Sequence, residues 1–65
     1  MIGVEARELR VGDVILGGVG TVLRLPSKPD EWGEITVVVA EDDGQRFLAK
    51  MDEDAYLRIE REGSE

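Results

Sequence analysis

Cysteine and histidine, the side chains that most often act as nucleophile, base or metal ligand, are both absent from this 65-residue chain. Without them the common Ser–His and Cys–His pairs are impossible, and an ordinary structural zinc site has no ligands. Neither serine, Ser27 or Ser64, has a plausible base beside it in the sequence. Carboxylate pairs remain, but acid–base work requires a cleft that shifts their pKa, and so short a chain rarely builds one. We therefore expect no enzymatic activity and no cofactor.

Two acidic triplets and a glycine-rich stretch are the remaining candidates for ligand chemistry. The triplets are Glu41-Asp42-Asp43 and Asp52-Glu53-Asp54. A calcium loop spaces its oxygen ligands on alternate positions around a glycine, and neither triplet does so. The glycines between Leu16 and Gly20 have no Walker lysine and no dinucleotide-binding spacing. We interpret the triplets as a hairpin tip and a solvated turn, and we expect no metal site.

Length and charge limit the possible classes of protein. The chain is long enough for one domain with a thin core, and its formal net charge is −7. A surface of this sign repels phosphates, so conventional nucleic-acid binding is disfavoured. No apolar run approaches the roughly 20 residues of a membrane span, and the N-terminus does not resemble a signal peptide. These features predict a soluble, cytoplasmic protein without membrane contact.

The segment from Glu34 to Met51 predicts a β-hairpin, around which the other elements are arranged. Gly44 can take the positive φ that closes a tight turn. A turn over Asp42-Asp43, with Gly44 as a left-handed bulge residue, keeps the apolar side chains together on one face. A register shifted by one residue would instead place Lys50 in the apolar row. The preferred register pairs Val39 with Phe47, Val37 with Ala49, Ile35 with Met51, Val38 with Leu48, Thr36 with Lys50 and Ala40 with Arg46.

Shorter elements flank this hairpin. Alternating apolar residues predict strands over residues 2–5 and 55–60, and a further strand over residues 14–25 that is interrupted at Gly17-Gly18 and bends at Gly20. Residues 6–9 have their apolar ends three positions apart, which is typical of one helical turn. We expect this turn to close one end of the domain with Leu9.

The order of these elements resembles that of the SH3-like barrels. Asp52-Glu53-Asp54 occupies the place where those barrels commonly have a one-turn 3₁₀ helix before the last strand. The segment from Leu9 to Ile15, followed by Gly18 to Val22, resembles the Gly-Asp turn and strand of KOW-type modules. The resemblance implies an all-β fold, a single five-stranded barrel. We transfer no binding residues from it, because KOW-type modules that bind RNA are usually basic, and the aromatic cluster of a proline-peptide groove is missing.

The expected barrel comprises residues 1–60, and residues 61–65 form a frayed acidic tail without apolar side chains. The rival architecture, an oligonucleotide-binding-type barrel, requires a helix that the sequence hardly offers. The predicted interior residues are Ile35, Val37, Val39, Phe47, Ala49, Leu57 and Ile59.

A non-enzymatic protein-binding or accessory module is the leading hypothesis for function. In size, composition and preference for arginine over lysine, the chain resembles small acidic proteins of bacteriophages and of their high-GC, actinobacterium-like hosts. A first alternative is a nucleic-acid-associated barrel that binds through Arg7, Arg10 and Arg24. A second is an acidic decoy that occupies the basic cleft of a nucleic-acid-binding protein.

Trp32, Val38 and Leu48 are the candidate partner surface. In the preferred register Val38 and Leu48 oppose each other on the outer face of the hairpin, and Trp32 is the only tryptophan. One interpretation is structural: the loop over residues 26–33 covers the pair, with Trp32 as a lid. The other is an exposed apolar patch for self-association or for an unknown protein partner, because exposed patches of this kind often mark interaction sites.

Overall fold

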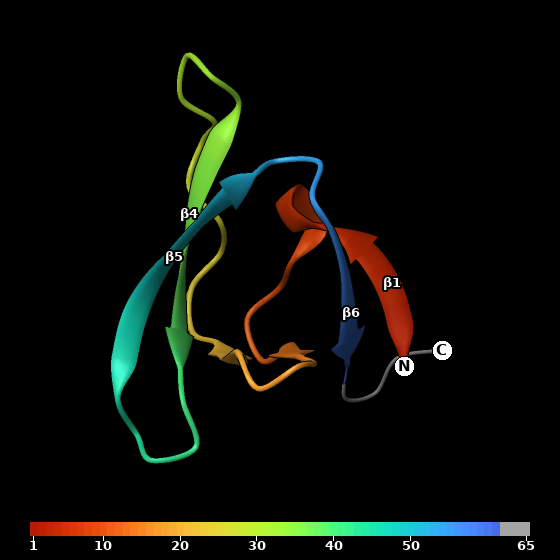
Figure 1. Ribbon diagram of the computed structural model, residues 1–65, viewed down its shortest axis with the longest axis vertical. Helices are drawn as coiled ribbons and strands as arrows, with labels where there is room; N and C mark the ends of the chain where they lie inside the picture. The colour runs from red at the N-terminus through yellow and green to blue at the C-terminus, as the bar shows by residue number, and fades with distance from the viewer. Residues whose placement is uncertain (62–65) are drawn as a thin grey trace.

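Residues 1–61, which are the residues that the computed structural model describes, form one strongly bent antiparallel sheet (Figure 1). The sheet has six strands in the order β1-β6-β2-β3-β4-β5, and its two end strands do not pair with each other. In chain order the elements are β1 (Ile2–Glu5), the 3₁₀ helix η1 (Ala6–Glu8), β2 (Val14–Ile15), β3 (Gly20–Val22), β4 (Glu34–Ala40), β5 (Arg46–Asp52) and β6 (Tyr56–Glu60). The all-β prediction is therefore confirmed, whereas the expected count of five strands is wrong.

The additional strand arises at Gly17-Gly18. Both glycines adopt positive φ, at 94° and 84°, and they reverse the chain so that β2 and β3 pair as antiparallel neighbours. Positive φ is accessible to glycine without a steric penalty. The predicted break at Gly17-Gly18 is confirmed, but it divides residues 14–25 into two separate paired strands, and the second is shorter than the predicted segment from Val19 to Leu25. Gly20 also has positive φ and lies so close to the Ala40 carbonyl oxygen of β4 that a Cβ would overlap it.

The hairpin of β4 and β5 has the predicted register. Ile35, Val37 and Val39 lie opposite Met51, Ala49 and Phe47. At the turn, the Glu41 amide donates to the Gln45 carbonyl at 2.8 Å, and the Gly44 amide donates to the Glu41 carbonyl at 2.9 Å. Gly44 has φ of 87°, as a left-handed bulge residue requires. The alternation of apolar residues was sufficient to fix this register.

The 3₁₀ helix lies after β1, and not before the last strand as the resemblance implied. Residues 53–54 form a hydrogen-bonded turn instead, in which the Ala55 amide donates to the Asp52 carbonyl at 3.0 Å. Two amides of η1, those of Ala6 and Arg7, donate to the carbonyls of Ala55 and Glu53 in the same turn. These bonds hold η1 across one end of the sheet. Leu9, directly after η1, is 2% exposed, so its predicted role as an end plug is confirmed.

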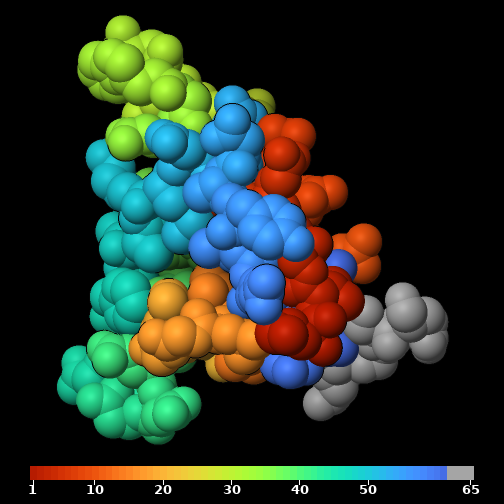
Figure 2. All heavy atoms as spheres, turned by 45° about the vertical axis from the view of Figure 1, so that its right-hand side comes forward, coloured from red at the N-terminus to blue at the C-terminus, as the bar shows by residue number. Residues whose placement is uncertain are grey.

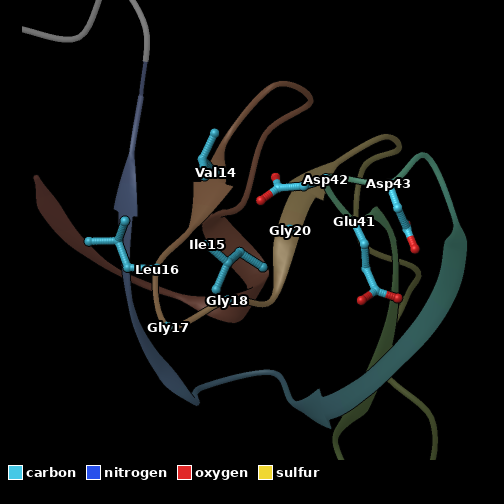
Figure 3. A pocket seen from close by; sticks show the side chains of 9 residues that line it. All are labelled: Val14, Ile15, Leu16, Gly17, Gly18, Gly20, Glu41, Asp42 and Asp43. Atoms are coloured by element: carbon cyan, nitrogen blue, oxygen red, sulfur yellow. The ribbon is translucent and has the colours of Figure 1, made fainter.

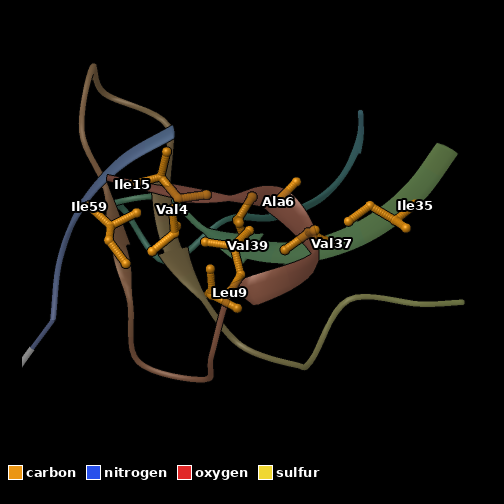
Figure 4. Packing of buried hydrophobic residues seen from close by; sticks show 9 residues of the cluster. Val4, Ala6, Leu9, Ile15, Ile35, Val37, Val39 and Ile59 are labelled. Carbon is orange, nitrogen blue, oxygen red and sulfur yellow. The ribbon is translucent and has the colours of Figure 1, made fainter. Parts of the chain in front are cut away.

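The core lies inside the bend of the sheet (Figure 4). It consists of Val4, Ala6, Leu9, Ile15, Val22, Ile35, Val37, Val39 and Ile59. Among the predicted interior residues, Ala49 and Leu57 are partly buried against this core. Phe47 is 37% exposed, and its assignment to the interior is wrong. Phe47 lies opposite the buried Val39, but β5 is an edge strand, and no further strand from residues 1–61 covers it.

The outer face of β1 and β6 is tightly packed at one position. Tyr56 is 70% exposed, but its ring lies over Gly3 of the neighbouring strand. A Cβ at Gly3 would overlap the Tyr56 hydroxyl group. The absence of a side chain at Gly3 is therefore what allows the ring to lie there.

Asp13 is the one buried charged residue among residues 1–61, with 1% exposure. The Arg61 guanidinium binds it in a bidentate arrangement, with Nε donating to Oδ1 at 2.8 Å and Nη2 to Oδ2 at 2.7 Å. The Arg10 amide also donates to Oδ2, at 2.9 Å. Arg61, which we expected to begin the frayed tail, is thus held in place. The rest of that expected tail, residues 62–65, lies outside the described residues.

These contacts change the pKa of both partners. The Arg61 hydrogen bonds, with the Arg10 amide, lower the pKa of Asp13, and burial opposes them only in part. The same pairing raises the pKa of Arg61. Bidentate guanidinium–carboxylate pairs are among the stronger charge-assisted interactions in proteins.

The revised core predicts that Ile59→Ala is more damaging than Phe47→Ala. Ile59 is fully buried, so its truncation should reduce the free energy of unfolding by on the order of 3 kcal/mol. Phe47→Ala should cost about 1 kcal/mol, because the ring already contacts solvent. Urea unfolding followed by far-ultraviolet circular dichroism measures both values. A larger loss for Phe47→Ala than for Ile59→Ala would contradict this core.

The Asp13–Arg61 pair predicts a specific loss of stability in acid. A carboxyl group whose pKa is lowered by folding contributes stability above its unfolded pKa of about 3.9, and this contribution is lost as the pH falls through the folded pKa. Hydrogen bonds to charged groups contribute about 1.5–3 kcal/mol, and the Arg61 side chain is partly exposed, so the lower end applies. Asp13→Asn should therefore be less stable than the wild type by about 1.5 kcal/mol at pH 7. Urea unfolding at a series of pH values should show this gap shrinking below pH 4, and a gap that is the same at pH 7 and pH 3 would refute the assignment.

Candidate functional site

Three apolar side chains form a row across the outer face of β4 and β5 and the residue that follows β3. Val38 of β4 lies opposite Leu48 of β5, as the sequence predicts. On the other side of Val38, the Leu23 amide donates to the Val38 carbonyl at 2.8 Å. Val22 points into the core opposite Val39, so Leu23 faces outward beside Val38. We call Leu23, Val38 and Leu48 the outer-face row.

Exposure increases along this row toward the free edge. Leu23 and Val38 are partly buried, whereas Leu48 is 67% exposed. Arg46 and Lys50 lie on either side of Leu48 on the same outer face, and both are exposed. The exposed end of the row, Leu48, therefore lies between two cations, although the net charge of the protein is −7. The alternation of Val22 and Leu23 carried the signal that could have added Leu23 to the predicted surface.

The loop before β4 does not cover the exposed end of the row. Ser27 lies along β4 on the side of β3: its amide donates to the Thr36 carbonyl at 3.0 Å, and its Oγ accepts from the Thr36 amide at 2.8 Å. β5, which carries Leu48, lies on the opposite side of β4. In Figure 2 the side chains of β5, in cyan, lie at the surface between the loop and the hairpin tip.

Trp32 is 75% exposed, so it is not a lid over the core. Asp30 shapes its loop: Oδ1 accepts from the Trp32 amide at 2.8 Å and from the Glu34 amide at 3.0 Å. The Glu34 and Trp32 hydrogen bonds lower the pKa of Asp30. Trp32 lies beyond Glu34, which is four residues from Val38 and thus about 13 Å away along the strand. The structure therefore places Trp32 apart from the outer-face row.

The three arginines proposed for nucleic-acid contact lie on separate segments. Arg7 is in η1, where its guanidinium pairs with the Glu5 carboxylate. Arg10 follows η1, and its amide donates to the Asp13 carboxylate. Arg24 follows β3 and is exposed. Because Glu5 neutralises Arg7, this group offers phosphates less positive charge than its three arginines suggest.

A hollow of about 450 Å³ lies between the Gly17–Gly20 turn and the hairpin tip (Figure 3). Glu41, Asp42 and Asp43 border it on one side. Their carboxylates point in different directions and do not converge (Figure 3). No cluster of three or more potential metal ligands occurs among residues 1–61. The hollow therefore offers no arrangement for metal chemistry.

Comparison with protein-family models, curated proteins and solved structures finds no match to this chain. None of the helical structure within residues 1–61 is long and apolar enough to cross a membrane.

The exposure of Trp32 predicts that its removal leaves the fold intact. Trp32→Phe should change the free energy of unfolding by no more than about 0.5 kcal/mol, because surface substitutions rarely do more. The fluorescence of the wild type should be quenched by acrylamide nearly as readily as that of free tryptophan. Emission shifted to shorter wavelength, together with weak quenching, would show that Trp32 is covered after all.

Proposed function

We propose that this protein is a non-enzymatic protein-binding module whose partner contacts the outer-face row. The observation that carries the proposal is Leu48, which is 67% exposed within a seven-residue edge strand and lies opposite Val38. Contiguous exposed apolar patches rimmed by polar residues mark protein–protein contact sites, and Leu48 continues the row formed by Leu23 and Val38. Arg46 and Lys50 beside it favour a partner surface that is apolar at its centre and acidic or neutral at its rim.

We further propose that the scaffold is a variant of the SH3-like barrels and that the protein acts in the cytoplasm. The bent sheet, the long loop before the central hairpin and the single turn before the last strand support the first proposal. The lack of cysteine in the sequence supports the second.

The two nucleic-acid hypotheses receive less support. The pairing of Arg7 with Glu5 and the net charge of −7 both weaken binding to phosphates. The decoy hypothesis requires a surface that imitates nucleic acid, and the acidic groups around the hollow diverge. A salt-sensitive gel shift with duplex or single-stranded nucleic acid would favour the arginines over the outer-face row.

Leu48→Asp should weaken capture of the partner at least tenfold, because it removes an apolar contact and places a charge at the contact site. Val11→Asp is the matched control: Val11 is 61% exposed, and the substitution adds the same charge outside the sheet. Immobilised wild type and both variants, each checked for folding by circular dichroism, are compared in quantitative pull-downs. Equal recovery of the same proteins by Leu48→Asp and Val11→Asp would contradict the proposal.

A further inference from the structure

The free edge of β5 carries main-chain hydrogen-bonding groups on alternate residues. Val38 and Thr36 direct their carbonyls toward the β3 side, where the amides of Leu23 and Ser27 donate to them. In an antiparallel ladder successive residues point to opposite sides, so Ile35, Val37 and Val39 direct their groups toward β5. Their partners on β5 are Met51, Ala49 and Phe47. The intervening residues Arg46, Leu48, Lys50 and Asp52 therefore direct their amides and carbonyls away from β4.

These outward groups form an open pairing surface. Among residues 1–61, the only main-chain bond from them outside the ladder is the one that the Asp52 carbonyl accepts from Ala55. Edge strands of this kind are templates for pairing with another strand. Natural proteins often protect such an edge with charged side chains, and Arg46, Lys50 and Asp52 are charged. The order of these charges along β5 determines which strand can pair with this edge.

Charge complementarity and the length of the ladder together select one register for pairing with a second copy. Two β5 strands related by a two-fold axis pair antiparallel, and the outward residues must face one another. If Leu48 faced Leu48, Arg46 of each copy would face Lys50 of the other, which places like charges together twice. If Lys50 faced Lys50, like charges would meet at the axis. If Ala49 faces Ala49, Arg46 of each copy faces Asp52 of the other, and opposite charges meet twice. A register centred on Met51 would also oppose Lys50 and Asp52, but it would pair Arg46 with Tyr56, beyond the end of β5.

The same register also covers the apolar groups that the single chain leaves exposed. Leu48 of each copy lies beside the aliphatic stem of Lys50 of the other, and Phe47 lies opposite Met51 on the inner face. Phe47 is 37% exposed and Leu48 67% exposed in the single chain. Both side chains would thus gain apolar neighbours from the second strand. Self-association is also one of the ways in which small domains supplement a thin core.

We propose that β5 binds β5 of a second copy of this chain, antiparallel and centred on Ala49, with Arg46 of each copy paired to Asp52 of the other. This inference rests on the proposed function, because it names the partner of the same strand. The resulting dimer extends the sheet from six strands to twelve across the two-fold axis. It also brings the outer-face rows of the two copies onto one continuous surface.

Reversing the charges tests both the contact and its register. Light scattering and sedimentation equilibrium over a concentration series should show the wild type moving from 7.2 kDa toward twice that mass. Arg46→Asp and Asp52→Arg each place like charges together twice, so each should weaken the dimer at least tenfold. An equimolar mixture of these two variants should dimerise, because each introduced charge then faces its opposite. The chain carrying both substitutions should regain the homodimer for the same reason.

Arg58→Asp is the matched control, because it makes the same change in net charge as Arg46→Asp at an exposed arginine of β6. It should leave the dimer within about twofold of the wild type. All variants are checked by circular dichroism, and their positions are exposed, so the fold should be retained.

The possible failures are distinguishable. A wild type that stays monomeric up to millimolar concentration overturns the inference. The proposed function would still be supported in that case if the wild type captured a foreign protein and Leu48→Asp did not. A dimer that is unaffected by either charge reversal, or that is not restored by the mixture, overturns the β5 register. A dimer that follows the charge pattern supports the inference even if pull-downs recover no foreign protein.

Discussion

The charge-assisted pair between Asp13 and Arg61 extends the ladder of β2 and β6 by one position beyond its last pair, Val14 and Glu60. Asp13 binds the Arg10 amide through its carboxylate, and its carbonyl accepts from the Val22 amide at 2.8 Å. Arg61 extends the contact to the Glu8 carbonyl, at 3.3 Å. Asp13 thus joins the segment after η1 and the residue after β6 through its carboxylate, and the end of β3 through its main-chain carbonyl.

Local patterns predicted the features that depend on local physics. The register of the central hairpin followed from alternation around Gly44, because a shift of one residue would move every apolar side chain to the wrong face. The opposition of Val38 and Leu48 followed from that register, so the main part of the candidate site was visible in the sequence. Leu9 was likewise recognisable as a plug from its spacing after Ala6. In each case residues close in the sequence were enough to predict the face on which a side chain lies.

Features that depend on contacts between distant parts of the chain were missed, because nearby residues do not determine them. Phe47 fits the apolar alternation, but its burial depends on whether another strand lies beyond β5, and residues 1–61 provide none. Arg61 follows the last strand in a polar stretch, and only the fold brings it to a carboxylate 48 positions earlier in the chain. Trp32 was grouped with Val38 and Leu48 by residue type, although the geometry of its loop is set by Asp30. Sequence patterns show which face a side chain takes, but they do not show what lies opposite that face.

The contact between Tyr56 and Gly3 has a consequence for how this sequence can diverge. A side chain at Gly3 is blocked while the Tyr56 ring lies over it, and loss of that ring leaves the glycine main chain of β1 uncovered. A larger residue at position 3 requires the exposed Tyr56 ring to move aside, so the two positions are coupled through the placement of that ring, although both lie on the outer face. In an alignment of descendants, the two columns should change together: glycine at position 3 accompanies an aromatic residue at position 56, and larger residues appear at position 3 where position 56 is small.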